Sequence, residues 1–263
     1  MPQGNLSKRL YEPSSVVMIS GGIDSVAVLK RLLEETDEKI YAHHVHIKNN
    51  EGMHNIKRYK AEALALRKIV PYMKKNFRDF HYSESTIDVR QMDYLRDGSS
   101  DIEDEKIINR IFSTYDTVYY HSIGGQLANI TNSSFMYTGD MQYSPASPIN
   151  NYRNPLIFKE TFKHLDLIFN GSAYPHKAEL KRPFWDKYCK TESVKYLGKE
   201  LMSMVFYCRN PIKKNGKILS CNTDLGFDHK ALDEETGQVF KCRPCKNVTD
   251  TFLELREEQQ RIH

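Results

Sequence analysis

A six-residue segment near the N-terminus constrains the fold more than any other part of the chain. Residues 20–25 are Ser-Gly-Gly-Ile-Asp-Ser and follow the apolar run 16–19, while the helix-compatible run 26–33 comes directly after them. A buried strand, a glycine turn and a helix start in this order build an anion site. The glycines bring the backbone close to a ligand, and the first helical amides favour negative charge. The sequence therefore predicts a phosphate site between a strand and a helix.

The polar side chains of this segment fit the same chemistry. Ser20 and Ser25 can add hydroxyl donors to phosphate oxygens. The carboxylate of Asp24 would repel phosphates, so it fits either as a helix N-cap or as a ligand of Mg²⁺ that bridges carboxylate and phosphate. The segment is not a Walker A loop, because no Gly-Lys-Ser/Thr follows at the required spacing.

Composition excludes some classes of protein. The chain has 263 residues, 40% hydrophobic and 27% charged, which is typical of globular proteins. Since no apolar stretch has the length of a membrane span or of a signal segment, we expect a cytoplasmic protein without a membrane partner. The net charge of +4 tolerates nucleic acid but does not require it. Five cysteines in that compartment indicate metal binding or chemistry rather than disulfides.

Strand and helix signals alternate in the first half, which predicts an α/β fold, a parallel sheet with helices on both faces. The predicted strands are residues 16–19, 40–47, 80–83 and 135–140, and the predicted helices are 26–35, 56–72, one from 107 with no clear end, and 191–205. Residues 143–155 are rich in proline and asparagine and predict an irregular loop. We expect the α/β domain to span residues 1–205, with a C-terminal region, 206–263, packed on it.

Four cysteines in the last third suggest a metal site. Cys242 and Cys245 form a Cys-x-x-Cys knuckle, and Cys208 and Cys221 lie upstream. Four thiolates can bind Zn²⁺ tetrahedrally, and metal would staple a segment that is poor in core residues. His229 is a weaker candidate than Cys221. Unrelated cysteines or a redox pair are the alternatives, and Cys189 is left over as a free thiol.

The six-residue loop resembles the Ser-Gly-Gly-x-Asp-Ser loop of the N-type ATP pyrophosphatases, also called PP-loop proteins. The resemblance implies a Rossmann-like fold similar to the adenine nucleotide α-hydrolases. It also implies cleavage of ATP between its α and β phosphates, with a carboxylate or amide activated as an adenylate. It would make the nucleotide-binding residues Ser20, Gly21, Gly22, Ile23, Asp24 and Ser25, with Mg²⁺ as the metal of the ATP site.

A second part of the sequence is similar to one family of these proteins, the 7-cyano-7-deazaguanine synthases of queuosine biosynthesis. It is the stretch 190–201, with Pro183 before it and Cys208 after it, together with the four-cysteine site. This resemblance implies structural Zn²⁺, 7-carboxy-7-deazaguanine and ammonia as substrates, an amide or nitrile product, and a homodimer. Asp24 and Lys190 would be the catalytic residues. The chain departs from the family in two places. It lacks the Cys-x-x-Cys-x-x-Cys run of the family and the family's Tyr-Pro-Asp-Cys-Arg-like substrate segment.

Three histidines lie on the predicted strand 40–47. Alternation puts His44 and His46 on one face and His43 on the other. Since the carboxyl end of a parallel strand borders the ligand crevice, His46 could approach the nucleotide. The alternative is that all three are hydrogen-bonded histidines without a ligand.

Other functions remain open at this point. The chain could adenylate another carboxylate, such as a protein terminus in an antiphage system. It could thiolate tRNA, with Cys189 as the spare reactive thiol. A binding module that keeps the loop without turnover is a third alternative.

Overall fold

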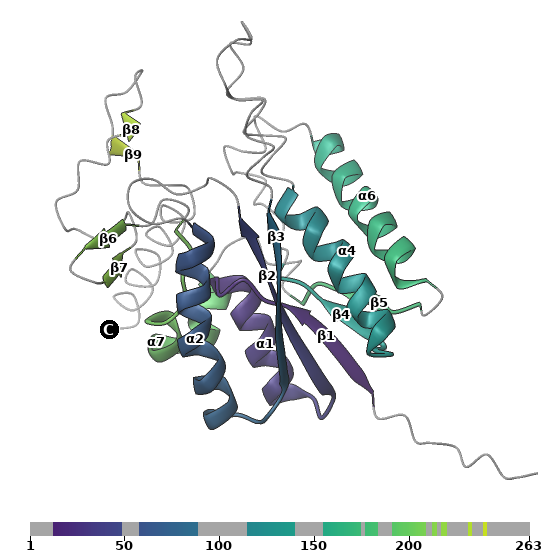
Figure 1. Ribbon diagram of the computed structural model, residues 1–263, viewed down its shortest axis with the longest axis horizontal. Helices are drawn as coiled ribbons and strands as arrows, with labels where there is room; N and C mark the ends of the chain where they lie inside the picture. The colour runs from purple at the N-terminus through teal and green to yellow at the C-terminus, as the bar shows by residue number, and fades with distance from the viewer. Residues whose placement is uncertain are drawn as a thin grey trace, which may run out of the picture.

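The computed structural model describes residues 13–48, 58–88, 115–139, 155–174, 177–183 and 191–208, together with four short strands beyond them. Figure 1 shows the elements in place. In chain order they are β1 (Ser14–Met18), α1 (Ile23–Glu35), β2 (Lys39–Lys48), α2 (Arg58–Asn76), β3 (His81–Asp88), α4 (Tyr115–Ile130), β4 (Phe135–Tyr137), α6 (Pro155–Ala173), β5 (Glu179–Lys181), α7 (Thr191–Met202), β6 (Ile212–Lys214), β7 (Lys217–Leu219), β8 (Ala231–Leu232) and β9 (Val239–Phe240).

Five strands form one parallel sheet in the order β3-β2-β1-β4-β5. The central strand β1 pairs Val17 with Ala42 on one side and with Tyr137 on the other. The chain builds outward from β1 through β2 to β3, and then returns to the other side of β1 for β4 and β5. This reversal makes the carboxyl end of β1 the switch point of the sheet, where ligands bind in open α/β folds.

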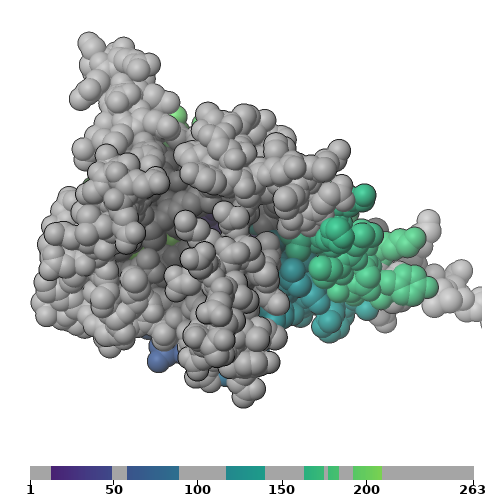
Figure 2. Space-filling model, turned by 90° about the horizontal axis from the view of Figure 1, so that it is seen from above, coloured from purple at the N-terminus to yellow at the C-terminus, as the bar shows by residue number. Residues whose placement is uncertain are grey.

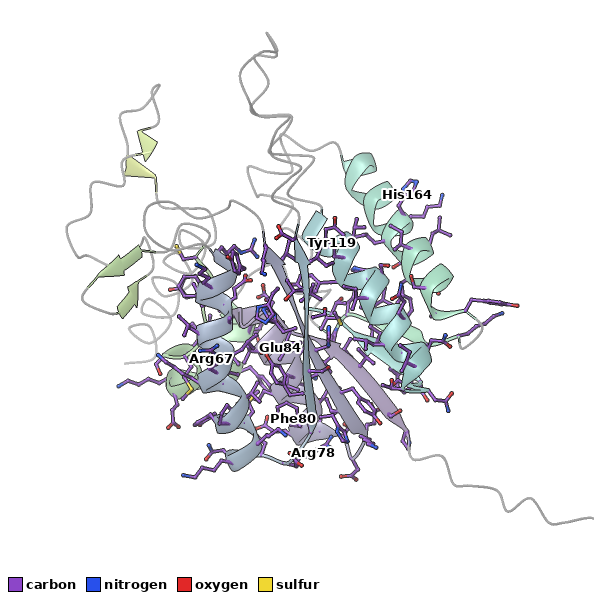
Figure 3. The ribbon with its side chains drawn as sticks, viewed as in Figure 1. Arg67, Arg78, Phe80, Glu84, Tyr119 and His164 are labelled. Atoms are coloured by element: carbon purple, nitrogen blue, oxygen red, sulfur yellow. The ribbon has the colours of Figure 1, made fainter. Side chains whose placement is uncertain are left out.

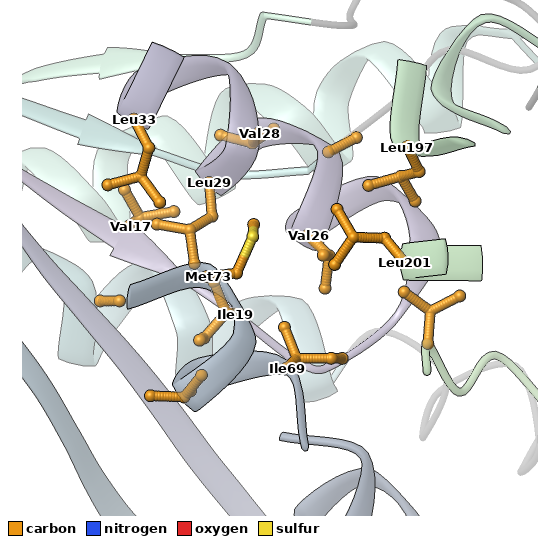
Figure 4. Packing of buried hydrophobic residues seen from close by; sticks show 14 of the residues in the cluster. Val17, Ile19, Val26, Val28, Leu29, Leu33, Ile69, Met73, Leu197 and Leu201 are labelled. Carbon is orange, nitrogen blue, oxygen red and sulfur yellow. The ribbon is translucent and has the colours of Figure 1, made fainter. Parts of the chain in front are cut away.

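Helices cover both faces of the sheet, as predicted. On one face α1, α2 and α7 enclose a core that includes Val17, Ile19 and Leu29 (Figure 4). On the other face α4 and α6 pack over Met18 and Met136 (Figure 1). The alternation of β1 side chains between these two cores explains why the whole strand is buried.

Helix α1 is buried on nearly all sides, because α7 covers the side that faces away from the sheet. Lys30 Nζ donates to the carbonyl oxygen of Tyr196 at 2.5 Å, and the Tyr196 hydroxyl donates to Glu34 at 2.6 Å. Farther along the chain, Leu201 of α7 and Val205, which follows the helix, pack into the hydrophobic core around α1. Helix α7 therefore runs antiparallel to α1, and its C-terminal end approaches the start of α1.

Several elements differ from the sequence prediction. Strand β3 extends to Asp88, well beyond the predicted 80–83, because as an edge strand it tolerates polar residues. Helix α7 ends at Met202 rather than at 205 and is kinked at Gly198, which has a φ of 71°. Helix α6 and strand β5 were not predicted. A helix was expected from residue 107 with no clear end; residues 107–112 lie outside the described residues, and α4 begins at Tyr115.

The C-terminal region contributes two short antiparallel hairpins, β6–β7 and β8–β9. The boundary at residue 205 between the two predicted regions stays a prediction. Within the described ranges, none of the helices combines the length and the apolarity needed to cross a membrane.

Candidate functional site

The predicted anion loop connects β1 to α1 at the carboxyl edge of the sheet, at the switch point between β2 and β4. In Figure 2, which views the molecule from above, α4 and α6 form the larger part of the surface of the described residues. Helix α1 begins at Ile23, so its first-turn amides lie outside the i→i−4 ladder of the helix and face this edge. The strand–turn–helix arrangement expected from the sequence is therefore present.

Gly21 gives the loop its shape. Its φ is +76°, a conformation that side-chain-bearing residues rarely adopt. A Cβ there would lie 3.2 Å from Leu66 Cγ and 3.3 Å from the carbonyl oxygen of Glu62, because α2 passes directly beside the loop. The glycine thus permits both the turn and the close approach of α2.

The two serines brace the loop from inside. The Ser20 amide donates to Ser25 Oγ at 3.1 Å, and the two hydroxyl oxygens lie 3.2 Å apart. Ser25 Oγ also donates to the carbonyl oxygen of Gly22 at 3.3 Å. These bonds place two hydroxyl groups at the start of α1.

Asp24 is the second residue of α1, and Gly22 is its N-cap. The interpretation of Asp24 as the N-cap is therefore wrong, since a residue inside the first turn has helical backbone angles. The alternative, a carboxylate that holds Mg²⁺, stays a prediction. Its catalytic role stays a prediction.

Gly139 packs beside this loop and is not among the site residues predicted from the sequence. It follows β4, and a Cβ at this position would lie 2.7 Å from the amide nitrogen of Ser25 and 2.9 Å from the carbonyl carbon of Asp24. The backbone after β4 therefore packs directly on the first turn of α1. A glycine that follows a central strand, opposite a glycine loop, is the signal that could have revealed it.

The histidines lie as the strand alternation predicts. His44 and His46 are on the face of α1 and α2, with ring centroids 4.4 Å apart. His46 Nε2 is 2.8 Å from the carboxylate of Glu84, a residue on β3 labelled in Figure 3. On the opposite face, the ring nitrogens of His43 bond the hydroxyls of Ser83 and Ser85 at 2.8 and 2.9 Å.

Burial and neighbouring charges set the protonation of this cluster. Burial lowers the pKa of His44 to about 4 and also lowers the pKa of His43, so both are neutral at physiological pH. Burial opposes ionisation of Glu84, but hydrogen bonds from Tyr82 and His46 outweigh it and hold the pKa of the carboxyl below its usual value. Glu84 is thus an ionised acceptor in the middle of β3.

A partly buried ion pair beside the loop was also not predicted from the sequence. Arg58 Nε lies 2.9 Å from Glu62 Oε1 at the start of α2, and the two side chains are 16% and 10% exposed. The i,i+4 spacing is visible in the sequence, but most such pairs are solvated. Only the contact between the carbonyl of Glu62 and Gly21 reveals that this pair lies near the loop.

The segment after α7 forms another wall of the loop. The Phe206 amide donates to the carbonyl oxygen of Gly21 at 2.8 Å. Two residues later Cys208 is buried, 1% exposed. The predicted ligands Cys221, Cys242 and Cys245, and the alternatives His229 and Cys189, lie outside the described residues, so the zinc site stays a prediction.

Lys190 lies outside the described residues, one position before α7. The first half of α7 contacts the second half of α1, through Tyr196 at Lys30 and Glu34. The hydrogen bond to the loop comes from Phe206, after the end of α7. The described part of α7 therefore adds no support to the role that resemblance implies for Lys190.

Comparisons with known proteins give only distant likenesses. No family model and no curated protein matches the sequence. One similar solved structure is the U34-tRNA thiolase NcsA from Methanococcus maripaludis with its 4Fe-4S cluster, at 14% identity and a TM-score of 0.44, covering 73% of this chain and 58% of that one. Another is the NH3-dependent NAD synthetase from Campylobacter jejuni subsp. jejuni NCTC 11168 in complex with nitrate, at 12% identity and a TM-score of 0.32, covering 63% and 69%. At this level of overlap neither protein's activity transfers to this chain.

Proposed function

We propose that this chain is an ATP-dependent adenylating enzyme of the PP-loop type. The observation that carries the proposal is the Ser-Gly-Gly-Ile-Asp-Ser loop at the switch point of a parallel sheet, with Gly139 packed on the first turn of α1. Gly139 has no Cβ to clash with the first turn of α1, and the donors at this turn are backbone amides and the two serine hydroxyls. Such a donor set fits a polyphosphate.

In this proposal each part of the loop has a separate task. The first-turn amides of α1 and the hydroxyls of Ser20 and Ser25 hold the phosphates, and Asp24 supplies a carboxylate to Mg²⁺. The metal would neutralise charge that develops on the phosphates. The carboxylate of an acceptor attacks the α phosphorus, the bond to the bridging oxygen breaks, and pyrophosphate leaves. The site acts by positioning and charge stabilisation, which needs no nucleophile from the protein.

For the acceptor we propose 7-carboxy-7-deazaguanine, on the resemblance of residues 190–201 and of the cysteine pattern to the 7-cyano-7-deazaguanine synthases. Ammonia would then displace AMP and give the amide, and a second activation would give the nitrile. Zinc would be structural, because four thiolates leave no open position for a substrate.

The test is to incubate the protein with ATP, Mg²⁺, ammonia and 7-carboxy-7-deazaguanine and to identify products by mass spectrometry. The matched variants are Asp24→Ala and Asp79→Ala, the second at an acid that is 87% exposed and paired with Lys74 on the opposite end of α2. A deazaguanine amide or nitrile from wild type and Asp79→Ala, but not from Asp24→Ala, supports the proposal. If pyrophosphate is released only with another carboxylate, that carboxylate replaces 7-carboxy-7-deazaguanine as the proposed acceptor. Copurified tRNA would favour tRNA thiolation. ATP binding without turnover would indicate a nucleotide-binding module without enzymatic activity.

Lys190 keeps the catalytic role implied by resemblance as a prediction. Lys190→Ala is compared with Lys199→Ala, an exposed lysine of α7. A fall in kcat for Lys190→Ala alone would support a contact between Lys190 and the phosphates. Equal activity of the two variants would rule out the catalytic role of Lys190.

A further inference from the structure

One buried histidine connects the neighbouring strand to the loop. His44 Nδ1 lies 2.8 Å from the carbonyl oxygen of Ile19, the residue directly before Ser20. A carbonyl oxygen can only accept, so Nδ1 must carry the hydrogen and Nε2 the lone pair. His44 is completely buried, at 0% exposure. Its tautomer is therefore fixed by the backbone of the loop.

The bond lies where the chain leaves the sheet. The amide of Ile19 still donates to the carbonyl oxygen of His43 at 2.8 Å and so continues the backbone ladder between β1 and β2. Its own carbonyl accepts from the imidazole instead. The side chain of His44 thus satisfies the last carbonyl before the turn, and a buried carbonyl left without a donor would be costly.

Neighbouring groups hold the ring in this orientation. The His46 ring meets that of His44 at 82°, and His46 is tied to Glu84, which also accepts from the Tyr82 hydroxyl at 2.6 Å. Among the described residues, His44 Nε2 has no hydrogen-bond partner. Within the described part of the chain, the imidazole of His44 therefore makes one hydrogen bond, from Nδ1 to the carbonyl oxygen of Ile19.

We propose that His44 is a positioning residue of the anion loop: its Nδ1–H fixes the carbonyl of Ile19 and thereby the direction in which Ser20 and Gly21 enter the site. The inference rests on the proposed function for its ligand-binding readout. It also predicts a loop property that can be measured without a ligand.

The test compares three variants. Asn carries a side-chain N–H near the position of Nδ1, so His44→Asn should keep the bond, whereas His44→Leu removes it. His43→Leu is the matched control, since His43 is the adjacent buried residue and bonds Ser83 and Ser85 on the opposite face. Calorimetry with Mg·ATP measures the Kd, and hydrogen exchange of residues 19–26 without ligand reports on the loop.

We expect His44→Leu to raise the Kd for Mg·ATP about tenfold, as the loss of one buried hydrogen bond implies, and to speed exchange in the loop. His44→Asn should restore both, and His43→Leu should change neither. Equal exchange and equal Kd in His44→Leu and wild type would overturn the inference while leaving the proposed function intact. If the wild type does not bind ATP, the proposed function fails and loop exchange alone decides the inference.

Nitrogen NMR of wild-type imidazoles covers the case in which a variant does not fold. The inference predicts a hydrogen on Nδ1 of His44, and a hydrogen on Nε2 instead would contradict it.

Discussion

Gly139, at the end of β4, lies with its backbone against the amide of Ser25, in the first turn of α1: a Cβ on Gly139 would be 2.7 Å from that nitrogen. Two segments more than a hundred residues apart thus meet at the predicted phosphate site. The contact involves backbone on both sides, so it cannot be relieved by rotating a side chain.

Gly139→Ala should therefore damage both stability and ligand binding. We expect a loss of about 1–3 kcal/mol in the free energy of unfolding, as for other overpacked positions, and a Kd for Mg·ATP at least about tenfold higher. Urea unfolding and calorimetry measure the two effects.

Gly171→Ala is the matched control, because a Cβ on this helical glycine of α6 meets nothing within 4 Å. It should leave binding unchanged and stabilise the protein by up to about 1 kcal/mol. Equal effects of the two alanine substitutions would contradict the close packing of Gly139 on α1.

The hydroxyls of Ser20 and Ser25 should act as a unit. Ser25→Ala removes the acceptor of the Ser20 amide and should cost about 1–2 kcal/mol of stability. A double-mutant cycle with Ser20→Ala should give a coupling of about 0.5–1.5 kcal/mol, since the two hydroxyls are in contact. Additive effects in urea unfolding would show that the two serines do not brace the loop together.

The proposed zinc site should be coupled to the loop. Cys208 lies two residues after Phe206, whose amide bonds the carbonyl of Gly21. Cys208→Ser should abolish bound zinc and raise the Kd for Mg·ATP about threefold to tenfold, because the wall of the loop loosens. Elemental analysis and calorimetry check this.

Cys189→Ser provides the comparison, since this thiol is not among the predicted ligands. It should keep both the zinc and the ATP affinity. Zinc retained in Cys208→Ser, or lost in Cys189→Ser, would require a different ligand set.

Stability should fall on acidification through His44. Burial, and secondarily the nearby His46 and His43, lower its pKa to about 4, while the bond to Ile19 and the charge of Glu84 act in the opposite direction. Because the folded-state pKa lies below the value of 6.5 for an exposed imidazole, the unfolded chain binds more protons between the two. The stabilisation is fully present above about pH 6.5 and decreases toward pH 4, by up to about 3 kcal/mol.

Urea unfolding at about pH 7 and at about pH 5 measures this decrease. His44→Asn cannot titrate, so its stability should fall less than that of the wild type over the same interval. His43 and Glu84 titrate in both proteins and cancel in the comparison. An identical decrease in the two proteins would show that His44 is not held neutral.

The local parts of this architecture could be predicted from the sequence. Strand β1, the glycine loop, α1 and β2 follow one another with strong apolar periodicity, and the alternation along β2 correctly separates His43 from His44. Most of the helix predicted over 191–205 is present, with Val194, Leu197 and Leu201 buried at helical spacing, although the helix ends before Val205.

The long-range parts could not. Helix α4 contains Gly124 and Gly125, which weaken the helix signal in the sequence. Both glycines are explained by close packing against other elements of the fold. A Cβ on Gly125 would lie 2.7 Å from Ser172 Cβ of α6. Strand β3 is polar because it lies at the edge of the sheet, and the contacts of Gly139 with Ser25 and of His44 with Ile19 exist only once strands and helices have packed.

We propose that this loop binds ATP for cleavage between the α and β phosphates. Phosphorus NMR of ATP turnover with Mg²⁺, ammonia and candidate carboxylates measures this cleavage, with Asp24→Ala as the comparison. AMP and pyrophosphate should appear together with wild type and be absent with the variant. ADP and inorganic phosphate as the products would contradict it.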